Sequence, residues 1–156
     1  DVIRIAQGQK KAPNLVRLLK DKKIEKIFHF ARFDLAVLYH AFGVMPAPVF
    51  CTKIASRLTR TYTDRHGLKD LVGELLDIQI SKQQQSSDWG AETLSSAQVE
   101  YAASDVLHLH RLRDILAGRL DREGRGDLAE ACFRFLPSRA MLDLTGWPEE
   151  DIFAHS

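Results

Sequence analysis

The chain has little cysteine, no long apolar run and almost no excess of either charge. Cys51 and Cys132 are too few and too far apart for a disulfide framework or a zinc knuckle, so we expect free thiols and a reducing, cytoplasmic setting. No apolar stretch is long enough to span a bilayer, and no basic-then-apolar start indicates a signal peptide. The net charge of +1 neither requires nor excludes a nucleic-acid partner.

The composition is that of a folded domain. With 45% apolar and 28% charged residues, a chain of 156 residues suits a single domain, spanning 1–156, with its own core. No internal repeat or second domain is visible. The chain opens without Met on Asp1-Val-Ile-Arg-Ile5, a strand-like pattern with no preceding turn or cap. We therefore expect the domain to be N-terminally incomplete.

Strand-like and helix-like segments alternate in the first half of the chain, and helices dominate the second half. Strands are expected at 2–5, 24–30 and 49–50. Helices are expected from Pro13, over 33–42 (buried on nearly every side and ended by Gly43), and over 52–59 and 68–76. A long helix is expected from about Ser95 to Ala117, capped by Ser95 or Ser96, and another after the chain break at Gly124 and Gly126, ended by Pro137. An ordered loop is expected at 81–90. This order fits a sheet covered by helices.

The helix expected after Ser95 carries an unusual acid. At about 100° per residue, Asp105 falls within the arc of Tyr101, Leu109, Leu112 and Leu116, which should face the core. An ionised carboxylate there is costly unless a cation or donors compensate it. Tyr101 lies four residues earlier, so the two side chains should be neighbours. The pair indicates a metal-dependent site; the alternative is a buried Asp bonded to backbone or to an Arg.

A second acid follows a strand. His29-Phe-Ala-Arg-Phe-Asp34 connects the strand expected at 24–30 to a helix, and open α/β sheets place ligand chemistry at such junctions. Asp34 also suits the first turn of a helix for purely electrostatic reasons. Two carboxylates at the rim of one sheet can, however, share a divalent cation, so we pair Asp34 with Asp105.

These motifs resemble those of a known family. His29-x-Ala-x-x-Asp34 and Tyr101-x-x-x-Asp105 are similar to the second and third motifs of the ribonuclease D-like 3′–5′ exonucleases, the tyrosine subtype of the DEDD superfamily. Between them, Gly67-Leu-Lys-Asp70 and Ser87-Asp-Trp89 stand in the family's order. The resemblance covers about Ile24 to Leu116. It implies an α/β, ribonuclease H-like exonuclease fold with a mixed sheet flanked by helices.

One motif of the family is missing. Its first motif, a strand-borne Asp-x-Glu, supplies two of the family's four metal-binding carboxylates and does not occur here. Asp121-Arg-Glu123 has the spacing but lies in a polar segment that we expect to break a helix, so we reject it. The absent N-terminal strands are expected to hold both acids. We therefore expect little or no activity from this chain alone.

The resemblance also implies a mechanism. Two Mg²⁺ or Mn²⁺ ions, about 3.5–4 Å apart, would clamp the scissile phosphate, with Asp34 and Asp105 among their oxygen ligands. Tyr101 would orient the attacking water. The products would be nucleoside 5′-monophosphates released from single-stranded RNA 3′ ends. The alternatives are a DNA 3′–5′ exonuclease and an inactive nucleic-acid-binding module.

Three residues are candidates for holding the nucleic acid: Arg32, Lys82 and Trp89. Trp89 could stack a base or pack in the core. A basic stripe on the helix expected at 52–59 (Lys53, Arg57 and Arg60) could track a phosphate backbone or form a solvated face. The histidines show no transition-metal pattern; His108 and His110, two apart on a helix, cannot converge on one ion.

Overall fold

The computed structural model describes residues 11–80, 87–91 and 93–156. The strand expected at 2–5 and most of the loop expected at 81–90, including Lys82, lie outside this part of the chain. Structural statements below refer to the described residues.

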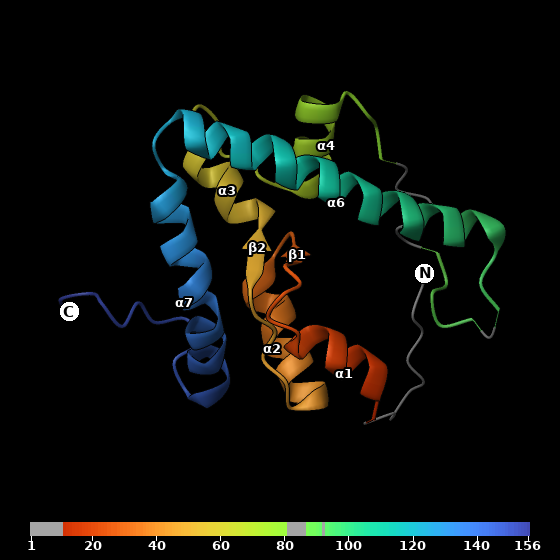
Figure 1. The fold of residues 1–156 in the computed structure, drawn as a ribbon, viewed down its shortest axis with the longest axis horizontal. Coiled ribbons are helices and arrows are strands. Elements are labelled where there is room, and N and C mark those ends of the chain that lie inside the picture. The colour runs from red at the N-terminus through yellow and green to blue at the C-terminus, as the bar shows by residue number, and fades with distance from the viewer. Residues whose placement is uncertain (1–10, 81–86, 92) are drawn as a thin grey trace.

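Two short parallel strands form the centre of the fold. β1 (Lys26–Phe28) pairs with β2 (Val49–Cys51), with Ile27 opposite Phe50. The helix α2 (Ala31–Phe42) connects them, as a parallel pair requires. β2 leads directly into α3 (Thr52–Thr59), so α2 and α3 both begin at the carboxyl edge of the pair (Figure 1). Both strands were predicted, although β1 is shorter than the segment 24–30.

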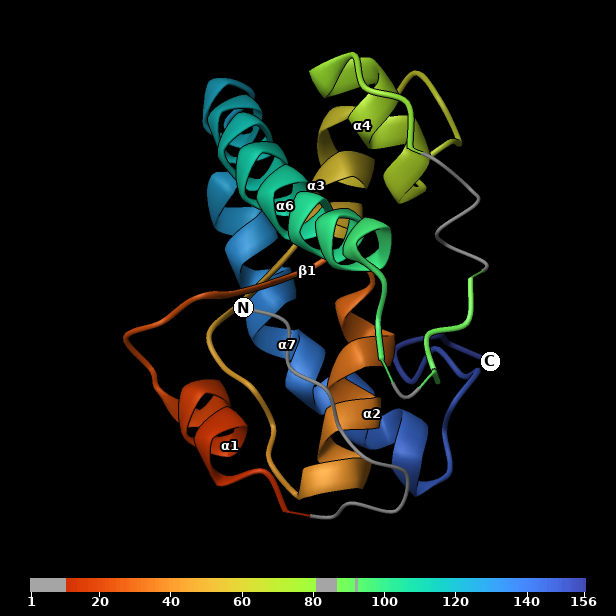
Figure 2. The ribbon, with the colours of Figure 1, turned by 90° about the vertical axis from the view of Figure 1, so that its right-hand side faces the viewer.

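The remaining helices cover this unit on several sides. α6 (Ser96–Arg122) packs against α3, against α4 (Leu68–Leu76) and against β1, whereas α7 (Gly126–Thr145) packs along α2 and β2. Figure 2 shows α3, α4 and α6 together at one end of the molecule, with α1 (Pro13–Lys20) and α2 at the other.

Local signals explain several of these boundaries. The Ser95 side chain accepts a hydrogen bond from the Gln98 backbone N–H (3.1 Å), and the Gln98 side chain accepts one from Ser95 N–H (2.8 Å). This capping box satisfies two of the backbone donors that a helix start leaves unpaired. Gly43 ends α2 in the left-handed conformation, φ 68°, which favours glycine. Both boundaries were predicted.

One core joins the layers. Leu35 of α2, Phe50 of β2, Leu71 of α4 and Leu112 of α6 are all fully or almost fully buried in one apolar cluster. α6 contributes Leu112, Leu116 and Leu120, which recur every four residues and so share a helix face. Burying each leucine stabilises the fold by about 2 kcal/mol. The core therefore fixes the rotation of α6, and with it the direction of Tyr101 and Asp105.

The last two helices, α6 and α7, extend further than the sequence predicted. Pro137 does not end α7, which continues to Thr145, because Leu136 and Ala140 both pack into the core and hold the helix across the missing backbone donor. The buried face of α7 also includes Ala129 and Phe133, while Leu128 is 55% exposed. Likewise α6 continues past Ala117 to Arg122, so Asp121 is helical.

α2 is not buried on nearly every side. Ala31 and Leu35 are fully buried, but Phe33 and Val37 are 58% and 48% exposed. The prediction of a fully buried helix was wrong in this respect, since apolar composition does not reveal which faces find a neighbour.

Candidate active site

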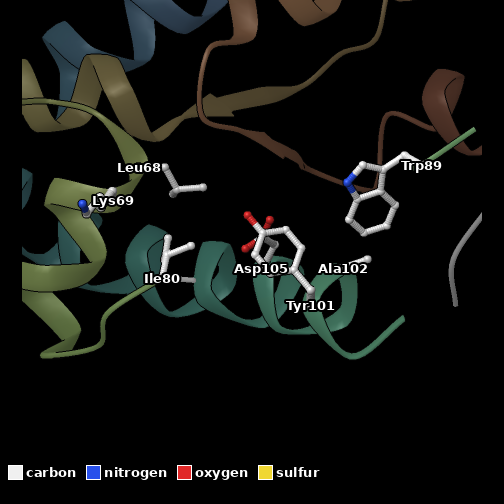
Figure 3. Close-up of a pocket in the computed structure, with 7 residues that line it drawn as sticks. All are labelled: Leu68, Lys69, Ile80, Trp89, Tyr101, Ala102 and Asp105. Carbon is white, nitrogen blue, oxygen red and sulfur yellow. The ribbon is translucent and has the colours of Figure 1, made fainter. Parts of the chain in front are cut away.

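Tyr101 and Asp105 line one pocket. It has a volume of about 460 Å³ and is formed by Leu68, Lys69, Ile80, Trp89, Tyr101, Ala102 and Asp105; we call it the carboxylate pocket. Figure 3 shows Tyr101 and Asp105 side by side on α6, with Trp89 at one end and Leu68, Lys69 and Ile80 at the other. The spacing of four residues thus does bring the phenol and the carboxylate together.

The Asp105 carboxyl lies in a desolvated position without a direct partner. Burial raises its pKa, and the nearby charge of His108 offsets this only in part. No described residue forms a hydrogen bond or an ion pair with its side chain. The alternative that Asp105 is bonded to backbone or to an Arg is therefore not what the described residues show. A carboxylate in this state favours an external cation.

The Tyr101 phenol is held in its protonated form. Burial and the negative charge of Asp105 both raise its pKa, which indicates that the two groups are close enough to interact. The ring centroid of Trp89 lies 6.0 Å from that of Tyr101, at an interplanar angle of 44°. Trp89 is half-buried and lines the pocket, so it belongs to the site. Its position is held by Gln98, whose side chain donates to Asp88 O (3.0 Å).

Asp34 occupies the position that its sequence context predicted, in the first turn of α2 after β1. Burial raises the pKa of its carboxyl as well. β1, which precedes α2, packs against α6. Asp34 is not among the residues that line the carboxylate pocket. That Asp34 and Asp105 share one cation stays a prediction.

These acids suit a hard divalent cation. Both carboxyls are desolvated and neither has a cationic side chain bonded to it in the described part of the chain, so a bound cation would supply the missing counter-charge. Residues 11–80, 87–91 and 93–156 contain no group of three or more His, Cys, Asp or Glu side chains that could hold a metal. That Asp34 and Asp105 bind a metal therefore stays a prediction.

Comparison with known proteins agrees with these motifs. The sequence profile of a family described as 3′–5′ exonuclease matches residues 2–121. The chain belongs to this exonuclease family. Ribonuclease D of Gluconacetobacter diazotrophicus is 42% identical over 123 residues, which are 79% of this chain and 31% of that protein. The chain spans about a third of the length of the ribonuclease D relatives it matches first.

Solved structures of exonuclease-family proteins share the fold. Brucella melitensis NrnC with bound Mg²⁺ is 71% identical, with a TM-score of 0.89, over 98% of this chain and 74% of that one. NrnC bound to pGG is 73% identical, with a TM-score of 0.87, over 96% and 72% of the two chains. Escherichia coli RNase D is 28% identical, with a TM-score of 0.71, over 81% and 33%. The predicted ribonuclease H-like exonuclease fold is thereby confirmed.

Of the three residues expected to contact nucleic acid, the structure describes Arg32 and Trp89. Arg32 forms a two-pronged ion pair with Asp143, both nitrogen–oxygen distances being 2.7 Å. It also donates to Pro148 O, so its charge is largely engaged in binding the end of the chain. Lys82 lies outside the described residues. For Arg32, a contact with substrate stays a prediction.

Arg60 is not part of a solvated basic stripe. It is only 3% exposed, its Nε lies 2.6 Å from Glu74 Oε2, and it donates to Ser56 Oγ and Arg65 O. The stripe prediction was wrong for Arg60, because the residue follows the last turn of α3 and turns toward α4. Lys53 and Arg57 remain at the surface or near it.

Two residues near the site were missed. Lys69 lines the carboxylate pocket. It belongs to the Gly67-Leu-Lys-Asp70 segment, whose place in the family's order could have indicated a role for it. His29 is a structural tie between the two strand-to-helix junctions: its Nδ1 lies 3.0 Å from Thr52 Oγ1. Burial and the charge of Lys53 lower the pKa of His29 to about 4, so its ring is neutral at neutral pH.

None of the helices in the described part of the chain is long and apolar enough to cross a bilayer. Cys51 and Cys132 are both free thiols there, as expected.

Proposed function

We propose that the full-length protein is a metal-dependent 3′–5′ exoribonuclease that releases nucleoside 5′-monophosphates from RNA 3′ ends. The observation that carries this proposal is the carboxylate pocket, in which the uncompensated acid Asp105 lies beside the protonated phenol of Tyr101. Membership of the exonuclease family and the likeness to NrnC with bound Mg²⁺ support it.

Asp34 and Asp105 would hold the divalent cation, Mg²⁺ or Mn²⁺, together with acids from a complete first motif. When bound, such ions lower the pKa of a coordinated water and stabilise negative charge on a phosphoryl oxygen. Asp105 contributes its carboxylate from a position where the core leucines fix α6, so the acid is oriented before substrate arrives.

Tyr101 positions the water that attacks the phosphate. Because burial and the charge of Asp105 raise its pKa, the Oη atom keeps its proton at neutral pH. It therefore acts as a neutral hydrogen-bonding group and not as the base. Within the described residues no partner satisfies this hydroxyl, which leaves it available to a water molecule.

The ends of the carboxylate pocket suit a nucleotide. Trp89 offers an aromatic face on which any base can stack, and Lys69 lines the opposite end of the pocket (Figure 3). The structure of NrnC bound to pGG supports a short RNA-like substrate for this chain.

Digestion of end-labelled oligonucleotides tests the proposal. With the full-length protein and Mn²⁺ or Mg²⁺, a 3′-labelled RNA should lose its label at once as a nucleoside 5′-monophosphate, and a 5′-labelled RNA should shorten stepwise. EDTA should stop both reactions. Matched DNA strands run in parallel: preferential digestion of DNA would overturn the RNA assignment, and internal cleavage would overturn the exonuclease assignment.

A nucleic-acid-binding module without catalysis is the second candidate. It is favoured by the lack of any metal-binding group of three or more side chains within the described residues. It predicts RNA binding that is insensitive to EDTA and no release of nucleotides with either metal. The same digestion series, run beside a binding titration, separates the two candidates.

A further inference from the structure

A second pocket borders the start of α2. It has a volume of about 400 Å³ and is lined by Phe30, Arg32, Cys51, Lys53, Ile54, Arg57, Leu136 and Arg139; we call it the cationic cleft. Its walls come from α2, α3 and α7. None of these residues lines the carboxylate pocket.

The cationic cleft has an excess of positive charge. Four of its lining residues are cations, and Asp143 pairs with two of them, Arg32 at 2.7 Å and Arg139 at 3.2 Å. Glu149 lies near enough to Arg32 to help raise the pKa of the guanidinium. No carboxylate of the described residues forms an ion pair with Lys53 or Arg57. These two charges are thus available to a ligand.

Backbone groups add to the positive potential. Phe30 and Cys51 are the N-cap residues of α2 and α3, and neither side chain caps its helix. Both line the cleft, so two helix N-termini, each with a partial positive charge, begin at its edge. This follows from the topology, because parallel strands deliver the helices after them to the same side.

Lys53 contacts the aromatic ring of Phe30, which lines the same cleft. Its Nζ lies 4.8 Å from the centroid of the Phe30 ring, and Phe30 in turn stacks on Phe33 at 6.0 Å. Both rings are about half exposed. A cation next to an exposed aromatic pair is the combination that binds a nucleotide unit, with the phosphate on the cation and the base on the ring.

We propose that the cationic cleft is a phosphate-binding subsite for the nucleic-acid strand, with Lys53 and Arg57 as its principal contacts. The proposal rests on the proposed function, which supplies a phosphate-bearing strand as the ligand. Phe30 and Arg32, at the start of α2, line the cleft, and Asp34 lies in the first turn of the same helix, so the cleft borders the element that carries one of the candidate catalytic acids. The phosphate is either the 5′-terminal one of a short substrate or an internucleotide one.

The test compares two charge-matched double variants of the full-length protein. Lys53→Gln/Arg57→Gln removes the two unpaired charges of the cleft, and Lys20→Gln/Arg122→Gln removes two exposed charges elsewhere. Binding of a fluorescent five-nucleotide RNA, with and without a 5′ phosphate, is measured by anisotropy in EDTA. Thermal melting checks that the variants are folded. If the double variant has a lower Tm than the wild type, the single variant Arg57→Gln, at an exposed position, replaces it in the binding measurement.

We expect the cleft variant to weaken binding on the order of tenfold and to reduce the slope of log Kd against log salt by about 0.7. A loss confined to the 5′-phosphorylated RNA identifies the terminal phosphate, and a loss with both RNAs identifies an internucleotide one. A Kd and a salt slope equal to those of the control variant would overturn the proposal.

The readout separates this proposal from the proposed function. Because binding is measured in EDTA, it does not depend on cleavage. If the cleft variant loses binding while the wild type releases no nucleotide, the subsite stands and the exonuclease proposal fails. If the wild type releases nucleotides and the cleft variant binds as the control does, the subsite fails alone.

Discussion

The carboxylate pocket and the cationic cleft are of similar size, about 460 and 400 Å³, but their charged lining differs: one acid, Asp105, and one base, Lys69, line the first, whereas four cations and no acid line the second. In the carboxylate pocket, Asp105 is desolvated and has no cation bonded to it among the described residues. In the cationic cleft, Asp143 pairs with Arg32 and Arg139, and Glu149 lies near Arg32. Asp105 therefore favours a divalent cation, whereas Lys53 and Arg57, which form no ion pair with a described carboxylate, favour a phosphate.

The two pockets also differ in how their residues are assembled. Tyr101 and Asp105 are four residues apart on one helix, so their proximity follows from helix geometry alone. Arg32, Lys53 and Arg139 come from three different elements and meet only through packing of α7 on α2 and α3. A functional site on one helix can thus be predicted from sequence spacing, while a cleft between helices cannot.

The largest effect is expected from Asp105→Asn. Loss of a metal-binding carboxylate should reduce exonuclease kcat of the full-length protein by about a thousandfold or more. The matched control is Asp114→Asn, whose side chain is 79% exposed on the same helix. Near-normal turnover of Asp105→Asn would reject the assigned role.

The same variant should be slightly more stable without metal. The folded-state pKa of Asp105 is raised, so its favourable contribution is present at low pH and is lost as pH rises through that pKa. At neutral pH the buried carboxylate is therefore a cost, which Asn removes. Thermal melting in EDTA at pH 7 measures this; a clear fall in Tm would point to a structural role.

Tyr101→Phe should have the next largest effect. It keeps the aromatic ring beside Trp89 but removes the hydroxyl, so kcat should fall about a hundredfold while the affinity for Mn²⁺ changes little. Single-turnover rates and calorimetric titration of the metal check the two parts. A comparable loss of kcat and of Mn²⁺ affinity would mean that the hydroxyl contributes to metal binding and does not position the water.

Replacing Arg60 and Arg57 by alanine, one at a time, should have very different effects on stability. Arg60 is buried and ion-paired with Glu74, whose side chain is 37% exposed, so its loss should destabilise the fold by about 2–3 kcal/mol. Arg57→Ala should change the free energy of unfolding by less than about 0.5 kcal/mol. Urea denaturation measures both; equal effects would refute the division into a structural and a surface arginine.

The last prediction concerns stability in acid. The folded-state pKa of His29 is about 4, below the ordinary 6.5, so the stability it contributes is complete above pH 6.5 and is lost as pH falls toward 4. Between pH 7 and pH 4.5 this amounts to about 2 kcal/mol. His29→Gln should therefore flatten the pH dependence of unfolding in that window. An unchanged slope would show that other groups cause it.

Much of the site follows from local sequence. The Ser95 cap, Gly43 and the i, i+4 spacing of Tyr101 and Asp105 each act within a few residues, and the structure confirms all three. The predictions that were wrong, for Pro137 and Arg60, failed because they considered local sequence alone. Pro137 lies within α7 because packing of Leu136 and Ala140 into the core outweighs the local preference of proline, and Arg60 is buried because it binds Glu74 of the next helix, α4.

The amino-acid sequence alone determined the periodic faces of the helices, their caps and the motifs that contain Asp34, Tyr101 and Asp105, since all of these depend on near neighbours along the chain. Only the tertiary structure decided which charges remain unpaired. Asp143 binds Arg32 across 111 positions of sequence, whereas Lys53 and Arg57 have no acid bonded to them in the described residues. Pairing depends on distance in space, and packing sets that distance.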